Sequence, residues 1–227
     1  MQAVAHGKET IGERVWKRIR SDILFGRLKP GQKLKLEQLK ADYGASVSAL
    51  REVLNRLSSE KLVVAKDQRG FEVAPVSVKD LKEIAALRLL LEAHALEQSF
   101  AAGDVDWEAQ VVAAHHKLAS MEQRMRAGRQ EAEEVETWKL YDWQFHQTLI
   151  SACNSRTLME THGVVFDRYL RYQMLALGFR GDIAANEHRM MLDCALERDA
   201  AKAIAVLGTH INGGVEHALS RGTELAN

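Results

Sequence analysis

Hydrophobic residues in the first third of the chain recur at the spacing of short amphipathic helices. Ile11, Val15, Ile19 and Ile23 form an i, i+4 stripe with basic residues between its members. Leucine and valine repeat in the same way farther along, and glycine or a capping serine marks the ends of the segments. The pattern predicts three helices, over residues 11–25, 36–43 and 47–60.

Two short segments rich in β-branched residues follow the third predicted helix. Leu62-Val63-Val64 and Phe71-Glu72-Val73 are predicted strands, and residues 67–70 are the predicted tip of the hairpin between them. Helix, short helix, turn, helix and two-stranded wing, in that order, predict a winged helix-turn-helix. This domain is expected over residues 1–74, with a linker at Ala74-Pro75-Val76.

The rest of the chain has a helical pattern throughout. Both prolines of the chain, Pro30 and Pro75, precede this part, so proline interrupts none of it. Glycine or asparagine separates six predicted helices, over residues 78–102, 107–127, 131–152, 156–177, 182–197 and 199–221. Because the loops are short, neighbouring helices are expected to pack antiparallel. The expected fold is mainly α, a winged helix-turn-helix with a small β-hairpin wing followed by an antiparallel bundle of six helices over residues 75–227.

Composition excludes several classes of protein. Hydrophobic residues make up 46% of the chain and charged residues 27%, the balance of a globular protein and not of a disordered one. No stretch approaches the ~20 apolar residues that span a bilayer, and residues 1–10 lack the apolar core of a signal peptide. Cys153 and Cys194 fall in different predicted helices. We therefore expect a cytoplasmic protein with no membrane partner.

The formal net charge of zero hides an asymmetry along the chain. Residues 1–76 carry 15 lysines and arginines against 9 acidic residues, and residues 77–227 carry 16 against 22, which accounts for the 31 residues of each sign. A basic first third favours contact with a polyanion at that end alone. An imbalance of this size also arises by chance, so charge by itself leaves both interpretations open.

The third predicted helix has the composition of a DNA-contacting helix at its start. In a helix-turn-helix, the first turn of this second helix of the pair meets bases and phosphates in the major groove. The hydroxyls of Ser46 and Ser48 and the helix N-terminus suit phosphate oxygens, and Arg51 can neutralise one phosphate. Arg69 and Gly70 at the predicted wing tip could reach the neighbouring backbone or minor groove. For each residue alone, a helix cap or a solvated surface side chain is an equally good interpretation.

Three histidines and one aspartate lie inside the apolar stripes of the predicted bundle. Asp142 and His146 are one turn apart in one helix, while His188 and His210 have apolar neighbours at helical spacing in two later helices. A carboxylate buried without a partner is costly. One carboxylate and three imidazoles from three helices are a sufficient ligand set for a transition metal, with positions left open for another ligand. Core histidines with hydrogen bonds of their own, and an ordinary Asp142–His146 pair, remain the alternatives.

Three motifs of the N-terminal part have a familiar spacing. They are Leu28-Lys29-Pro30-Gly31, Leu50-Arg51-Glu52-Val53-Leu54 and Arg69-Gly70-Phe71-Glu72-Val73. Together they resemble the DNA-binding domain of GntR-family bacterial transcription regulators, over about residues 11–73. The resemblance implies that operator DNA is the polyanion.

The chain departs from the family pattern at the start of the third predicted helix. Family members usually carry arginine where Val47 stands and proline where Ala49 stands, and that arginine contacts DNA. The operator is therefore expected to be atypical or bound more weakly. Basic residues that remain for phosphate contacts are Lys33, Lys35, Lys40, Arg51 and Arg56.

The bundle carries a second group of matching residues. Asp142-Trp143-Gln144-Phe145-His146, Glu187-His188 and His210 resemble the FCD effector-binding domain found in the largest branch of the same family. Members with this aspartate and three histidines generally hold a divalent metal, which often anchors a small carboxylate effector. The resemblance thus implies a divalent transition metal, Zn, Ni, Mn or Fe, on Asp142, His146, His188 and His210. Arg88, four residues before Glu92, could pair with the effector carboxylate, and an Arg88–Glu92 ion pair within the helix is the alternative.

The main hypothesis is a metabolite-responsive transcription regulator, a homodimeric repressor and not an enzyme. The first alternative is a metal-dependent helical-bundle enzyme that activates water. Against it, no Glu-x-x-His pair is present, Glu187 directly precedes His188 and so points to another face, and an enzyme leaves the winged helix unexplained. The second alternative is a regulator in which the metal is only structural or is itself the signal.

Overall fold

The computed structural model describes residues 10–66, 70–128, 132–176 and 180–221. The chain divides into two compact units, Met1–Val76 and Ser77–Asn227. The division falls after Val76, two residues beyond the expected end of the first domain. Among the described residues, no helix has the length and apolar character needed to cross a membrane.

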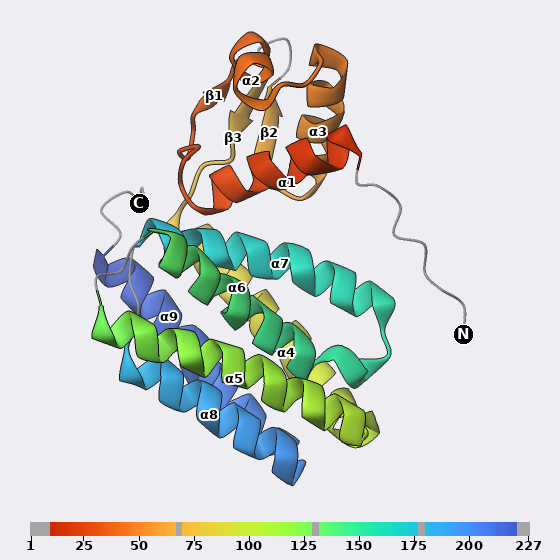
Figure 1. Cartoon of the computed structure of the whole chain (residues 1–227), viewed down its shortest axis with the longest axis vertical. Coiled ribbons are helices and arrows are strands. Elements are labelled where there is room, and N and C mark those ends of the chain that lie inside the picture. The colour runs from red at the N-terminus through yellow and green to blue at the C-terminus, as the bar shows by residue number, and fades with distance from the viewer. Residues whose placement is uncertain (1–9, 67–69, 129–131, 177–179, 222–227) are drawn as a thin grey trace. The chain divides into compact units, whose positions relative to one another are not determined.

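Three short helices build most of the N-terminal unit (Figure 1): α1 (Ile11–Leu24), α2 (Leu36–Tyr43) and α3 (Val47–Ser59). Side chains cap two of them, since Thr10 Oγ1 accepts from the Glu13 N–H and Ser46 Oγ accepts from the Ala49 N–H. Gly44, at φ +66°, ends α2 in the left-handed conformation that glycine adopts without steric cost. The described helices agree with those predicted from periodicity to within one residue at each end.

The wing of this unit is a three-stranded antiparallel sheet, one strand more than the sequence predicted. Strands β2 (Val63–Lys66) and β3 (Gly70–Val73) form the predicted hairpin, with Val63 opposite Val73. Strand β1 (Lys33–Leu34) pairs with the other edge of β3, so the order is β1-β3-β2. A two-residue strand has too little alternation to be found from the sequence. Residues 67–69, which include the predicted wing contact Arg69, lie outside the described residues.

The described residues of the C-terminal unit form six α-helices, which confirms the predicted bundle (Figure 1): α4 (Val78–Ala102), α5 (Val105–Ala127), α6 (Ala132–Leu149), α7 (Arg156–Leu175), α8 (Asp182–Glu197) and α9 (Ala200–Arg221). Three boundaries differ from the prediction by two residues or more, and one of them is the end of α7, at Leu175 and not at residue 177. Helix α5 begins two residues early because Asp104 caps it by accepting from the Trp107 N–H. Helix α6 ends at Leu149, and a short 3₁₀ turn, Ser151–Cys153, follows it.

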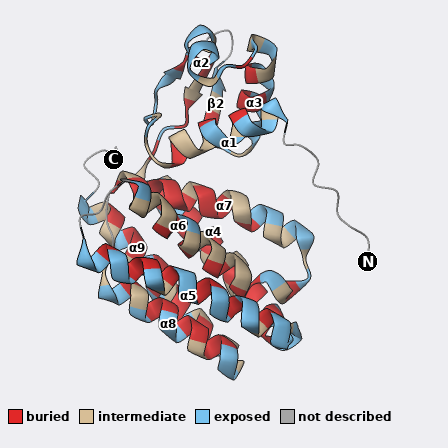
Figure 2. Cartoon of the chain, viewed as in Figure 1, coloured by how far each residue is buried: buried red, intermediate tan, exposed pale blue. Residues whose placement is uncertain are grey.

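Both units contain buried residues (Figure 2), but they differ in the kind of side chain that is buried. The buried side chains of the described N-terminal unit are apolar, whereas all the buried polar and charged side chains of the described residues lie in the bundle. Arg88 and Glu92 on α4 have exposed fractions of 0% and 1%. Because an unpaired buried charge costs several kcal/mol, this concentration of charge in the bundle core requires specific partners. It marks the interior of the bundle as the candidate functional site.

Candidate metal centre and DNA-contacting residues

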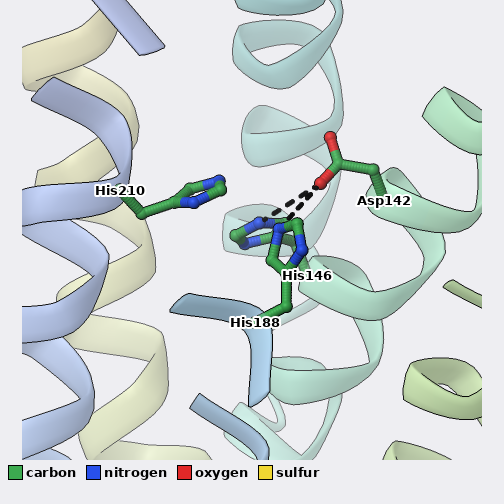
Figure 3. A group of neighbouring side chains, drawn as sticks. All are labelled: Asp142, His146, His188 and His210. Atoms are coloured by element: carbon green, nitrogen blue, oxygen red, sulfur yellow. Dashed lines mark ion pairs between the residues drawn. The ribbon is translucent and has the colours of Figure 1, made fainter. Parts of the chain in front are cut away.

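Four side chains that the sequence analysis proposed as metal ligands converge inside the bundle (Figure 3). Asp142 and His146 come from α6, His188 from α8 and His210 from α9. One ligand atom from each lies within 4.8 Å of the others, and all four residues are buried. We call these four residues the ligand set.

Two ring nitrogens that face the centre, His146 Nε2 and His188 Nε2, have no hydrogen-bond partner within the part of the chain that the structure describes. His188 Nε2 lies 3.2 Å and His146 Nε2 lies 3.8 Å from Asp142 Oδ1, which are ion-pair distances without the alignment of a hydrogen bond. Both nitrogens are fully buried and unsatisfied among the described residues. A buried polar atom with no partner is destabilising, whereas a metal ion would use both lone pairs. The donor set of three imidazoles and one carboxylate is suited to Zn, Ni, Mn or Fe.

The opposite nitrogen of each ring is held by a carboxylate from a different helix. Each imidazole Nδ1 lies at hydrogen-bond distance from one glutamate: His146 from Glu92 of α4 at 3.0 Å, His188 from Glu122 of α5 at 2.7 Å, and His210 from Glu187 of α8 at 2.8 Å. Where Nδ1–H donates to the carboxylate, the lone pair lies on Nε2, toward the centre. His146 Nδ1 has a second neighbour, Arg88 Nη2 at 3.1 Å, which can only donate and so competes with Glu92 for that nitrogen. Metal-binding histidines in proteins are supported in this way. The arrangement therefore fits a metal centre better than it fits three core histidines.

Electrostatics separate the three histidines. Burial lowers the pKa of His146 and, together with the two neighbouring histidines, holds the pKa of His210 well below its usual value. Burial also acts to lower the pKa of His188, but the carboxylates of Asp142 and Glu122 outweigh it and raise that pKa to about 9. Although burial opposes it, Lys139 and the histidines hold the pKa of Asp142 well below its ordinary range. In the metal-free centre, His188 therefore carries the proton and Asp142 is ionised.

A small cavity adjoins the ligand set. Its volume is about 20 Å³, room for about one water molecule. Three members of the ligand set, Asp142, His188 and His210, contribute to its wall. The other polar side chains of the wall are Lys139, Gln173, Arg180 and His217. The wall of the cavity thus combines metal-binding side chains of the ligand set with the cationic side chains of Lys139 and Arg180. This combination suits a small anion that contacts a metal and a cation at the same time.

Arg88, proposed from the sequence as the effector contact, is completely buried beside Glu92. Its Nε donates to Glu92 Oε1 at 2.6 Å, and its guanidinium lies over the Phe166 ring, 4.3 Å from the centroid. The ion pair that the sequence left open as the alternative is thus present. Arg88 does not contribute to the wall of the cavity, and its contact with an effector stays a prediction.

Sequence reasoning did not identify two residues of the site and misjudged a third. Glu122 looked like one of many surface glutamates, because nothing local shows that its face of α5 meets His188. Glu187 does point away from His188, as expected, but that face of α8 meets His210 on α9. Lys139 continues the inward stripe of Asp142 and His146 at a spacing of 3 and 4, a signal that could have found it.

On the N-terminal unit, most proposed DNA contacts are exposed. Ser46 and Ser48 lie at the start of α3 with their Oγ atoms 3.1 Å apart, and Ser46 also caps the helix. Exposed residues among the proposed contacts are Lys35, Ser46, Ser48, Arg51, Arg56 and Gly70.

Arg56 differs from the other proposed contacts because it already has partners within the unit. Its guanidinium lies over the Trp16 ring at 3.8 Å and forms an ion pair with Glu60 at 3.4 Å. These contacts compete with a phosphate for the same charge. Arg51 is therefore the better candidate for a phosphate contact on α3.

Two family models match the chain, one over each unit. The model described as bacterial regulatory proteins, gntR family, matches residues 11–73. The model of the FCD domain matches residues 83–213. The first match covers the winged helix-turn-helix and the second covers the helices that supply the ligand set.

Three relatives of similar sequence are named as transcription regulators. The uncharacterized HTH-type transcriptional regulator BphR of Paraburkholderia xenovorans is 36% identical over 206 residues, 89% of this chain and 83% of that protein. The HTH-type transcriptional repressor GlaR of Escherichia coli is 29% identical, over 85% of this chain and 89% of its own length. The gluconate operon transcriptional repressor of Bacillus subtilis is 29% identical over 64% of this chain and 56% of its own length.

Solved structures share the fold. E. coli McbR/YncC superposes with a TM-score of 0.77 at 19% identity, covering 93% of this chain and 98% of that one. A putative transcriptional regulator GntR from Rhodococcus sp. RHA1 superposes with a TM-score of 0.74 at 21% identity, covering 92% and 97%. These likenesses confirm the predicted fold, a winged helix-turn-helix joined to a helical bundle.

Proposed function

Because the chain belongs to the GntR family of bacterial transcription regulators, we propose that its ligand set holds a divalent metal and that the bundle senses a small organic acid there. Regulators of this family bind operator DNA through the winged helix and an effector through the FCD domain. The chain is thus a transcription regulator and not an enzyme. The metal, the acid and the sign of regulation are the proposed part.

The observation that supports the proposal most directly is how the two ring nitrogens of each histidine are placed. Each Nδ1 lies at hydrogen-bond distance from a glutamate, and the Nε2 atoms of His146 and His188 are buried beside Asp142 with no hydrogen-bond partner among the described residues. A histidine that only fills the core does not need a buried glutamate at its Nδ1, yet all three histidines have one. A bound divalent ion would supply positive charge and open positions for a carboxylate oxygen. Zn, Ni, Mn and Fe all suit this donor set.

The sensed ligand is proposed to be a small carboxylate because cations surround the cavity. Lys139 and Arg180 line it beside the ligand set. Arg88 remains a candidate contact if the core rearranges when the ligand binds. The relative that is named a gluconate operon repressor fits a regulator responsive to an organic acid.

We propose repression by a homodimer. Two copies present two winged helices to two operator half-sites, and a ligand that prefers one arrangement of the bundle changes how well both fit at once. The DNA contacts would come from Ser46, Ser48, Arg51 and Lys35, with Gly70, Arg69 and Arg56 beside them. Relatives named repressors support the sign of regulation.

Binding to selected operator DNA, followed by fluorescence anisotropy, tests this function. The metal-loaded protein should bind DNA, and a small carboxylate should release it. After chelation the protein should still bind DNA but should no longer respond to the acid. If the chelated protein responds as strongly as the loaded one, the metal is not part of the receptor.

Chelation also separates the sensing role from a structural one. If removal of the metal unfolds the bundle, as seen by circular dichroism, the metal is structural. The proposal expects the helical signal to stay, because the bundle core has many buried apolar residues besides the ligand set.

A further inference from the structure

A buried lysine lies beside the ligand set without belonging to it. Lys139, on α6, has an exposed fraction of 4%. Its Nζ donates to Gln173 Oε1 at 2.8 Å, lies 3.4 Å from Asp142 Oδ2, and lies over the Trp138 ring, 3.9 Å from its centroid. A buried ammonium is costly unless a negative partner offsets it. Asp142 is a shared partner, since its other oxygen faces His146 and His188.

The ammonium of Lys139 has capacity for one more acceptor. It carries three N–H donors, and the contacts with Gln173 and Asp142 use two of them. Lys139 also forms part of the wall of the 20 Å³ cavity. An acceptor placed in that cavity would therefore lie between the ammonium and the ligand set.

Charge balance in the loaded centre specifies the acceptor. The charged groups around the ligand set, all buried except the partly exposed Arg180, are four carboxylates, Asp142, Glu92, Glu122 and Glu187, and three cations, Arg88, Arg180 and Lys139. A divalent ion added to these groups leaves a surplus of one positive charge. A single carboxylate neutralises this surplus, whereas a dianion would leave the buried centre negative.

The surroundings of the cavity indicate what is attached to that carboxylate. Arg180 and His217 line both the cavity and an open surface cleft of about 860 Å³, so they form the wall between the two. Most residues that line the cleft have polar side chains, Glu187, Thr209 and Asn212 among them. A ligand with one carboxylate oxygen in the cavity would extend past Arg180 and His217 toward these groups, which suits hydroxyls better than an alkyl chain.

We infer that Lys139 is a ligand-binding residue that selects a hydroxylated monocarboxylic acid, whose carboxylate accepts a hydrogen bond from its ammonium. The inference rests on the proposed sensing function and adds the charge of the ligand and the residue that recognises it. The competing role for Lys139 is to orient Asp142 for the metal, as outer hydrogen bonds do for ligating carboxylates. The two roles differ in whether loss of Lys139 removes the acid or the metal.

The test is calorimetric titration of the metal-loaded full chain with gluconate, propionate and succinate, together with metal analysis. Wild type is compared with Lys139→Met, which removes the charge at similar length, and with Lys79→Met, whose side chain is 87% exposed on α4. Lys139→Met should keep about one metal per chain but bind gluconate about 10- to 100-fold more weakly, the range for a lost hydrogen bond to a charged group. Lys79→Met should behave as wild type, and wild type should prefer gluconate to the other two acids. If Lys139→Met does not fold, Lys139→Gln carries the same expectation.

Four results would overturn the inference. Undiminished gluconate binding by a folded Lys139 variant removes the residue from the ligand site. Loss of metal from that variant assigns Lys139 to the support of Asp142. Tighter binding of succinate or propionate than of gluconate by wild type contradicts the ligand class. Wild-type protein that takes up metal but binds none of the three acids contradicts the proposed sensing function as well, and so is distinguished from a failure of Lys139 alone.

Discussion

His146, His188 and His210 each place one ring nitrogen at hydrogen-bond distance from a glutamate, and His146 and His188 direct the other toward Asp142. The glutamates lie on α4, α5 and α8, so the orientation of the three rings depends on helices far apart in the sequence. The proton that His188 retains near neutral pH must leave before its Nε2 binds a metal, because only the neutral imidazole is a ligand. Metal binding is thus linked to proton release at a single, identifiable residue.

Removing one supporting carboxylate should weaken the metal without removing a ligand. Glu122→Gln keeps the size of the side chain but loses the charge that faces His188 Nδ1, and supports of this kind contribute about 10- to 100-fold to metal affinity. Competition with a fluorescent zinc chelator measures the change. Glu83→Gln, at a side chain that is 64% exposed on α4, is the control. Equal affinity in the two variants would show that Glu122 does not support the centre.

The raised pKa of His188 predicts how stability depends on pH. An unfolded histidine titrates near pH 6.5, and His188 in the folded metal-free protein titrates at about 9. The stability it contributes is therefore complete below pH 6.5 and is lost as the pH rises through 9, by up to about 3 kcal/mol. Urea unfolding of the metal-free protein at pH 6.5 and pH 9 measures this loss.

Two comparisons isolate His188 in that experiment. In the metal-loaded protein His188 is neutral, so this loss between pH 6.5 and pH 9 should be absent. His188→Gln without metal should likewise remove the His188 part of the slope. A metal-free wild type whose free energy of unfolding is the same at both pH values contradicts the assigned protonation.

Among the elements, α7 connects the cavity to the start of the bundle. Gln173 accepts from Lys139 at the cavity wall. Its neighbour Tyr172 accepts from the Ser77 N–H at 3.1 Å and donates to Asp80 Oδ2 at 2.8 Å, at the first turn of α4. Two adjacent residues of one helix thus touch the ligand site and the first residue after the linker. A shift of α7 on ligand binding would therefore change the contacts at the cavity wall and those at the start of α4.

Tyr172→Phe should uncouple sensing from DNA release. The variant keeps the ring in the core but loses both hydrogen bonds to the start of α4. We expect unchanged metal and acid binding, with the effect of the acid on DNA affinity reduced several-fold, within the usual range of coupling energies. Anisotropy titrations with and without gluconate measure this effect, with Tyr141→Phe on α6 as the control. Full release of the Tyr172 variant by the acid would exclude this route.

Most of the fold follows from local patterns, and what the sequence missed depends on tertiary pairing. The helices follow from apolar periodicity and from caps such as Ser46 and Ser77. Strand β1 exists only because Leu34 pairs with Phe71. The ligand set could be proposed from the sequence because its members lie on apolar faces. The glutamates that support it could not, because each is recognisable only once the packed helices bring it to a histidine.

The whole molecule joins a basic, apolar-cored unit to a bundle with charged groups at its centre. The described N-terminal unit buries only apolar side chains, and its exposed basic residues remain for DNA. In the bundle, by contrast, many charged side chains are buried, and those around the ligand set form ion pairs and hydrogen bonds with one another. This division of charge agrees with DNA binding by one unit and ligand sensing by the other.

Arg51→Ala tests the DNA-binding face. Arg51 is exposed in the second turn of α3, five residues after the capping Ser46. Its loss should weaken binding and reduce the slope of log affinity against log salt by about one phosphate contact. Arg156→Ala, 91% exposed on the bundle, is the control and should leave the slope unchanged. An unchanged slope for the Arg51 variant would place it outside the interface.

The central claim is a metal held by Asp142, His146, His188 and His210, and metal content tests it most directly. Elemental analysis of the purified, tag-free protein should find about one transition metal per chain. A variant with alanine at both His146 and His188, shown by circular dichroism to be folded, should contain none. Equal metal in both proteins, or none in wild type even after incubation with zinc or nickel, would contradict the claim and leave these histidines as core residues of a DNA-binding regulator.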